Sequence, residues 1–112
     1  MRALDDILVL DLSRVLAGPW CTQNLADLGA TVVKVESPTG DQLRTMTHPL
    51  VEGRSLLYLH TNRGKRSLAL DLKDPAAIEL VRRLAAGADV LIENFKPGTM
   101  EKFGLSAVAL QA

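Results

Sequence analysis

Apolar and polar positions along the chain follow the period of strands in some segments and that of helices in others. Short apolar runs bounded by polar residues predict buried strands at residues 7–12, 31–36 and 88–95. A fourth segment, "SLALDL" at residues 67–72, alternates apolar and polar positions and predicts another strand. The remaining segments with a clear period are helical, so strands and helices alternate.

The helix predicted after the first strand begins near Pro19, because proline is well placed in a first helical turn, and ends before Gly29. Cys21, Leu25 and Leu28 are spaced to share one helical face. We expect this face to be buried, with Cys21 acting as a small core hydrophobe rather than as a nucleophile.

The clearest helix covers residues 75–87, with Asp74 as its N-cap, Pro75 as its first residue and Gly87 as its end. Its expected apolar face consists of Ala77, Leu80, Val81 and Leu84. The segment "KPGTMEKFG" predicts a turn opening into a short helix, and "LSAVALQA" predicts the start of another. Residues 37–55 have no clear period and are interpreted as a long loop with one helical turn.

Alternating strands and helices predict an α/β fold with a parallel sheet flanked by helices. In such sheets ligands bind at the carboxyl ends of the strands. Three predicted loops meet at that edge: 13–17, 36–38 and 94–97.

A chain of 112 residues is one domain at most, and its 13 basic and 13 acidic residues cancel. A neutral chain has no long-range attraction for nucleic acid or an anionic membrane, so neither is expected as a partner. One cysteine cannot form an internal disulfide, which favours the cytoplasm, and with His48 and His60 it does not make a metal site. Because the last helix lacks the usual stop signal, we expect the chain to be a truncated part of a larger domain.

Three features could contribute to a ligand site, and each also has a structural interpretation. Ala17 and Gly18 at a helix start suit an anion, or are only a tight turn. Glu36 could bind a ribose hydroxyl, or lie in water at a strand end. The basic segment "NRGKRS" could bind phosphate, or be a solvated loop. The sequence contains no pair of acid and base residues at a catalytic spacing and no nucleophile motif, so we expect no catalytic residues within the chain.

Together these motifs resemble the family III coenzyme A transferases, which include formyl-CoA transferase, carnitine CoA-transferase and the α-methylacyl-CoA racemases. The stretches that carry the resemblance are "VLDLSRVLAGPWCTQNLADLGATVVKVESPTGDQLR", "NRGKRSLALDLKDP" and "ADVLIENFKPGTMEKFGL". The resemblance implies that residues 1–112 are the N-terminal part of a CoA-binding, Rossmann-like large domain. It implies an interlocked homodimer that acts on acyl-CoA and a carboxylic acid, through acyl intermediates on an aspartate beyond residue 112.

The same resemblance assigns CoA contacts, with adenine and ribose on the first loop. The residues implied are Val15, Leu16, Ala17, Leu70, Asp71, Leu72, Lys73, Asn94, Phe95, Lys96 and Lys102. It implies that Trp20 and Cys21 serve packing. Ser37 departs from the pattern, because members often carry a basic residue there. An α-methylacyl-CoA racemase of the same family and a non-catalytic binding fragment are the alternatives to a transferase.

Overall fold

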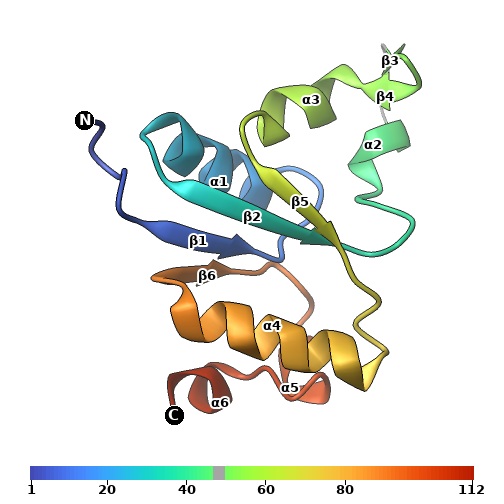
Figure 1. Cartoon of the computed structure of the whole chain (residues 1–112). Coiled ribbons are helices and arrows are strands. Elements are labelled where there is room, and N and C mark those ends of the chain that lie inside the picture. The colour runs from blue at the N-terminus through green and yellow to red at the C-terminus, as the bar shows by residue number, and fades with distance from the viewer. Residues whose placement is uncertain (47–49) are drawn as a thin grey trace.

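The computed structural model describes residues 1–46 and 50–112, and these form an α/β fold around a parallel sheet (Figure 1). His48 lies outside the described residues. In chain order the elements are β1 (Leu8–Asp11), α1 (Ala17–Asp27), β2 (Thr31–Glu36), α2 (Leu43–Met46), β3 (Leu50–Val51), β4 (Arg54–Ser55), α3 (Leu56–Asn62), β5 (Arg66–Ala69), α4 (Pro75–Gly87), β6 (Val90–Ile92), α5 (Thr99–Lys102) and α6 (Ala107–Gln111).

The sheet has the strand order β5-β2-β1-β6, with each neighbouring pair parallel. All four strands therefore end at the same edge. Helices α1 and α3 lie over one face, and α4, α5 and α6 lie over the other (Figure 1). The predicted α/β class with a parallel sheet is confirmed, and this arrangement is Rossmann-like.

Each face of the sheet has its own core, because successive strand residues point to opposite faces. Under α4 the buried cluster is Leu10, Leu12, Val35, Val81, Met100 and Leu105. Under α1 it is smaller and consists of Val9, Ala30 and Val32. On the α1 face the strands change from apolar residues to Asp11, Lys34 and Glu36 as they approach their carboxyl ends, and all three are buried. This charged half of the α1 face sets the geometry of the candidate site.

Helix α4 matches the prediction from its caps. The Asp74 side chain accepts a hydrogen bond from Ala76 N, 2.9 Å away, and Pro75 is the first helical residue. Ala77 and Val81 are buried, and the helix ends at Gly87. The two short helices expected near the C-terminus are α5 and α6.

The predicted buried face of α1 is wrong at Cys21 and Leu28, whereas Leu25 is half-buried and packs against the cluster under α1. Cys21 is exposed, Leu28 is 52% exposed and Trp20 is 56% exposed, so the packing roles of Cys21 and Trp20 are not found in this chain. The buried residues of α1 are instead Pro19, Thr22 and Gln23. The reason is that the sheet beneath this helix presents Asp11, which needs a polar partner, and Thr22 supplies the hydroxyl.

Several segments differ from the sequence prediction. The strand predicted at residues 88–95 is the shorter β6, Val90–Ile92. Residues 67–72 were predicted as a strand, but β5 covers Arg66–Ala69, and Asp71 then accepts a hydrogen bond from Lys73 N in a local turn. The predicted loop 37–55 holds α2, as expected, and also the β3–β4 hairpin. Helix α3 was not predicted. Among the described residues, no helix is both long and apolar enough to cross a bilayer.

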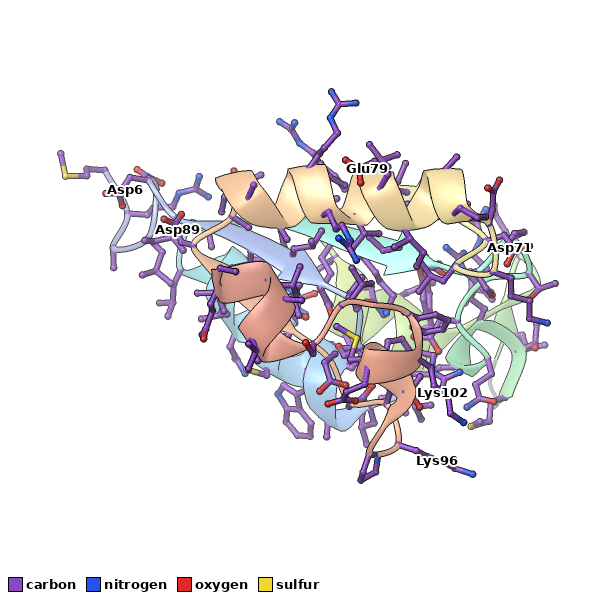
Figure 2. The ribbon with its side chains drawn as sticks, turned by 90° about the horizontal axis from the view of Figure 1, so that it is seen from below. Asp6, Asp71, Glu79, Asp89, Lys96 and Lys102 are labelled. Carbon is purple, nitrogen blue, oxygen red and sulfur yellow. The ribbon has the colours of Figure 1, made fainter. Side chains whose placement is uncertain are left out.

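Removing the α4 cap tests how strongly local sequence sets this element. We expect Asp74→Ala to lower the free energy of unfolding by about 0.5–2 kcal/mol, because Ala76 N loses its acceptor. Glu79→Ala is the control, since Glu79 projects from the same helix into solvent (Figure 2) and surface changes of this kind stay within about 0.5 kcal/mol. Urea unfolding followed by circular dichroism measures both, and equal losses would contradict the capping role.

Candidate functional site

A cavity of about 420 Å³ lies at the carboxyl ends of β1, β2 and β5. Its walls are residues 12–14, 34–37, 39–42 and 70–73, with Phe95, Thr99 and Phe103. Its position is the one expected for a ligand site in a parallel α/β sheet. The volume falls within the usual range for small-molecule pockets.

The cavity brings together part of the predicted CoA-contact set. The predicted residues that line it are Leu70, Asp71, Leu72, Lys73 and Phe95. Those outside its walls are Val15, Leu16, Ala17, Asn94, Lys96 and Lys102. Lys102 lines an adjoining open groove of about 630 Å³. Leu72 and Lys73 line both this groove and the cavity. Lys96 is exposed and points away from the body of the molecule (Figure 2).

Sequence reasoning missed Arg14 and Phe103. The Arg14 guanidinium lies 5.0 Å from the centroid of the Phe95 ring, and Phe95 and Phe103 meet edge to face at 6.2 Å. Within residues 1–46 and 50–112, neither Arg14 nor Lys73 forms an ion pair. The cavity therefore combines half-buried aromatic rings with two cations that are free to meet an anion. Arg14 lies within the predicted 13–17 loop, and this position was the available signal.

Asp11 is the first of three buried carboxylates beside this cavity. It accepts hydrogen bonds from Ser13 N and Ser13 Oγ, from Thr22 Oγ1 and from Lys65 Nζ at 3.1 Å. Burial lowers the pKa of Lys65, while the Asp11 carboxylate opposes that change. Lys65 also donates to Pro19 O at 3.0 Å, which ties the 63–66 segment to the start of α1.

Neither interpretation of the basic "NRGKRS" segment fits all of it, because Arg63 and Arg66 are exposed and Lys65 is not. Lys65 is buried against Asp11, and Arg63 pairs with Asp27 at 2.6 Å. Arg66 is exposed on β5. Arg63 and Lys65 are therefore directed to two different carboxylates, and the segment is neither a cluster of three free cations nor a fully solvated loop. A local count of charges could not show this, because Asp11 and Lys65 lie 54 residues apart.

Glu36 is the second buried carboxylate, and it is neither solvated nor available to a ribose. Its oxygens accept hydrogen bonds from Arg44 Nε at 2.8 Å, Arg44 Nη2 at 2.7 Å, Asp41 N at 2.6 Å and Tyr58 OH at 2.9 Å. Burial by itself raises the pKa of Glu36. The donors from Arg44, Asp41 and Tyr58 outweigh burial and lower the pKa to about 2.

Asp41 is the third buried carboxylate, and it pairs with Lys34 at 2.8 Å. Both Asp41 oxygens accept from Val15 N at 3.1 Å, and Oδ1 also accepts from Leu43 N at 3.0 Å. Val15 has φ of +70°, the left-handed conformation that β-branched residues rarely adopt. The site thus holds its first loop in a strained conformation.

Gly18 fits the close approach of α1 to this loop. A Cβ at position 18 would overlap the Cβ and Oγ of Ser13. Leu16 is the N-cap residue of α1, and in the described part of the chain the start of this helix has no side-chain capping hydrogen bond. The expected tight turn is therefore present, and it follows residues 12–14 of the cavity wall directly in the chain.

The arrangement suits binding rather than covalent chemistry. Asp11, Glu36 and Asp41 are all committed to hydrogen bonds within the fold. No group of three His, Cys, Asp or Glu side chains that could hold a metal ion occurs in the described part of the chain. His60 is exposed on α3.

Comparison with known proteins gives a consistent match. The model of CoA-transferase family III matches residues 4–112. Human succinyl-CoA:glutarate CoA-transferase is 47% identical over 106 residues, covering 94% of this chain and 24% of the relative. The succinyl-CoA:mesaconate CoA-transferase of Haloarcula hispanica is 53% identical over 107 residues, covering 92% of this chain and 27% of the relative.

A solved structure described as a CAIB/BAIF family protein from Brucella suis superposes with a TM-score of 0.92 at 49% identity. The match covers 98% of this chain and 30% of that one. The chain therefore spans about a quarter of the length of the curated relatives it matches.

The lowered pKa of Glu36 predicts a pH-dependent share of stability. Because the folded pKa is about 2 and the ordinary value is 4.5, this share is present above pH 4.5 and is lost as the pH falls toward 2. At about 1.4 kcal/mol per pH unit, it amounts to roughly 3 kcal/mol. We expect Glu36→Gln to be less stable than the unaltered chain at pH 7, with the difference narrowing between pH 5 and 2. Urea unfolding across this range measures it, and a difference independent of pH would refute the role of the Glu36 charge.

Proposed function

The chain belongs to the family III CoA-transferases, and on that premise we propose that residues 1–112 are the N-terminal part of the CoA-binding large domain of such an enzyme. The activity we propose for the whole protein is the transfer of coenzyme A from an acyl-CoA to a second carboxylic acid. Relatives are named for succinyl-CoA with glutarate or mesaconate. Succinyl-CoA and a dicarboxylic acid are therefore the substrate class we propose to test first.

The cavity at the strand ends is the observation that carries the CoA assignment. Coenzyme A presents an adenine ring and a 3′-phosphate beside a diphosphate. Phe95 and Phe103 offer apolar surface, and Arg14 and Lys73 offer cations without a carboxylate partner in the described chain. Family members often carry a basic residue at the position of Ser37. Arg14 lines the same cavity and offers a positive charge that the serine does not provide.

We propose that the CoA contacts extend over the residues predicted from the resemblance. They comprise Val15, Leu16 and Ala17 on the first loop, Leu70, Asp71, Leu72 and Lys73 after β5, Asn94, Phe95 and Lys96 after β6, and Lys102 in the adjoining groove. The uncapped start of α1, which follows residues 12–14 of the cavity wall in the chain, supports the first group. The shared lining of cavity and groove supports the inclusion of Lys102.

The covalent step is assigned outside these residues. We propose that an aspartate beyond residue 112 carries the acyl intermediates, because the buried carboxylates of this chain are committed within the fold. The resemblance supports a homodimer as the working assembly. A cytoplasmic location is supported by the single exposed cysteine, Cys21, which fits a reducing compartment.

Titration calorimetry with the 112-residue chain tests the CoA site directly. We expect CoA to bind more tightly than dephospho-CoA, because only CoA carries the 3′-phosphate for the free cations, and we expect NAD to bind least. Tighter binding of NAD than of CoA would refute the assignment. Equal affinity for CoA and dephospho-CoA would show that the cavity does not bind the 3′-phosphate.

A pair of lysine variants tests which cations meet the ligand. Lys73 lines both cavity and groove, whereas Lys96 is exposed and points away from the body of the molecule (Figure 2). Lys73→Met should weaken CoA binding about five- to tenfold, the size of about 1 kcal/mol expected for a partly solvated ion pair. Lys96→Met removes the same charge and should change affinity less. A larger loss of affinity in Lys96→Met than in Lys73→Met would indicate that the phosphate is bound near Asn94–Lys96 instead.

A further inference from the structure

The backbone of the first loop is held by side chains from other parts of the fold. Ser13 N donates to Asp11 Oδ1 at 2.9 Å, and Ser13 O accepts from Lys34 Nζ at 3.4 Å. Asn94 holds both sides of Arg14, accepting from Arg14 N at 2.9 Å and donating to Arg14 O at 2.8 Å. Four successive backbone polar groups are therefore bound by side chains rather than by a helix or a sheet.

Val15 continues this series and is the strained residue within it. Its N–H donates to the Asp41 carboxylate, while its φ of +70° places a β-branched residue in the left-handed region. Such a conformation persists only where the surroundings hold it, and held strain of this kind is concentrated at ligand sites. The loop 13–17 is thus fixed at the point where it turns from β1 into α1.

Asp41 is well placed to hold that strain. Its side chain is 0% exposed and is anchored by Lys34 Nζ at 2.8 Å and by Leu43 N at 3.0 Å. Asp41 is a residue of the cavity wall, but its carboxylate is fully buried and committed to hydrogen bonds, so it is not open to a ligand there. It can act on a ligand only through the backbone that it binds.

We propose that Asp41 is a positioning residue, which locks Val15 in the left-handed conformation and so sets the loop 13–17 for the ligand. The proposal deepens the proposed function, on which it rests for the identity of the ligand as CoA. It assigns a role to a residue that the sequence analysis did not single out. A purely structural role for Asp41 would lower stability but leave the affinity of the folded molecules unchanged.

The test compares Asp41→Asn with Asp89→Asn in the 112-residue chain. Asn keeps the shape of Asp41 and offers one acceptor where two are used. Asp89 is the matched control, because its carboxylate also accepts a backbone N–H, from Leu8 at 2.8 Å. It lies at the other end of the molecule from Asp71, a residue of the cavity wall (Figure 2). Both variants change the net charge equally, so long-range attraction for anionic CoA rises equally.

Two readouts are needed, both taken where circular dichroism shows the variant folded. Amide hydrogen exchange by NMR reports on Val15 N–H without any ligand. We expect at least 100-fold protection in the unaltered chain, at least tenfold faster exchange in Asp41→Asn, and exchange within twofold in Asp89→Asn. Titration calorimetry with CoA should show at least tenfold weaker binding for Asp41→Asn and a change within twofold for Asp89→Asn.

Each outcome decides the proposal. An unprotected Val15 amide in the unaltered chain, or unchanged exchange in Asp41→Asn, would overturn it, as would faster exchange with unchanged CoA affinity. Absence of CoA binding by the unaltered chain would contradict the proposed function instead, and the exchange data would still decide whether Asp41 holds the loop. If Asp41→Asn does not fold, Asp41→Ser replaces it with the same expectations, since its hydroxyl can accept only part of what the carboxylate accepts.

Discussion

The buried carboxylates near the carboxyl ends of the strands are the constraint on which the rest of this structure depends. An ionised carboxylate removed from water costs several kcal/mol unless it is paired and hydrogen-bonded. Asp11, Glu36 and Asp41 meet this requirement with partners from other elements: Lys65 for Asp11, Arg44 and Tyr58 for Glu36, and Lys34 for Asp41. Satisfying each carboxylate therefore fixes the position of another element. The α3 segment, the 37–42 loop and the start of α1 are all tied to the strand ends in this way.

The two faces of the sheet have different roles: the face under α4 holds the larger apolar core, and the face under α1 fixes the geometry of the loops at the strand ends. Under α4 the core is apolar, and its contribution depends on buried area and shape. On the other face, the apolar cluster occupies only the amino-terminal half, and the charged residues take over where the strands end. Directional hydrogen bonds specify geometry more sharply than apolar contacts do. The loop 13–17 is thus built on the polar half of the sheet, where side-chain hydrogen bonds can hold a valine in the left-handed conformation.

Much of the fold could be predicted from sequence because its signals are local. Helix α4 carries its own N-cap, Pro75 and apolar stripe, and β2 has the predicted bounds Thr31–Glu36. Helix α3 was missed because its buried residues are Tyr58 and Thr61, which leave no apolar stripe to read. The β3 and β4 strands have two residues each, too few to show a period. In the site, the family resemblance pointed to Leu70–Lys73 and Phe95, which line the cavity, whereas Arg14 was passed over.

The sequence by itself determined the parallel α/β class, the alternation of the sheet strands with α1 and α4, and the edge of the sheet at which the cavity lies. These follow from periods and caps that act over a few residues. The tertiary structure decided which charges are free and which are committed, because ion pairing joins residues far apart in the chain. In the folded chain Lys65 binds Asp11, 54 residues away, and Glu36 is buried against Arg44. Arg14 and Lys73 line the cavity. The tertiary structure also decided the strain at Val15, since the acceptor that holds its N–H lies 26 residues further along, at Asp41.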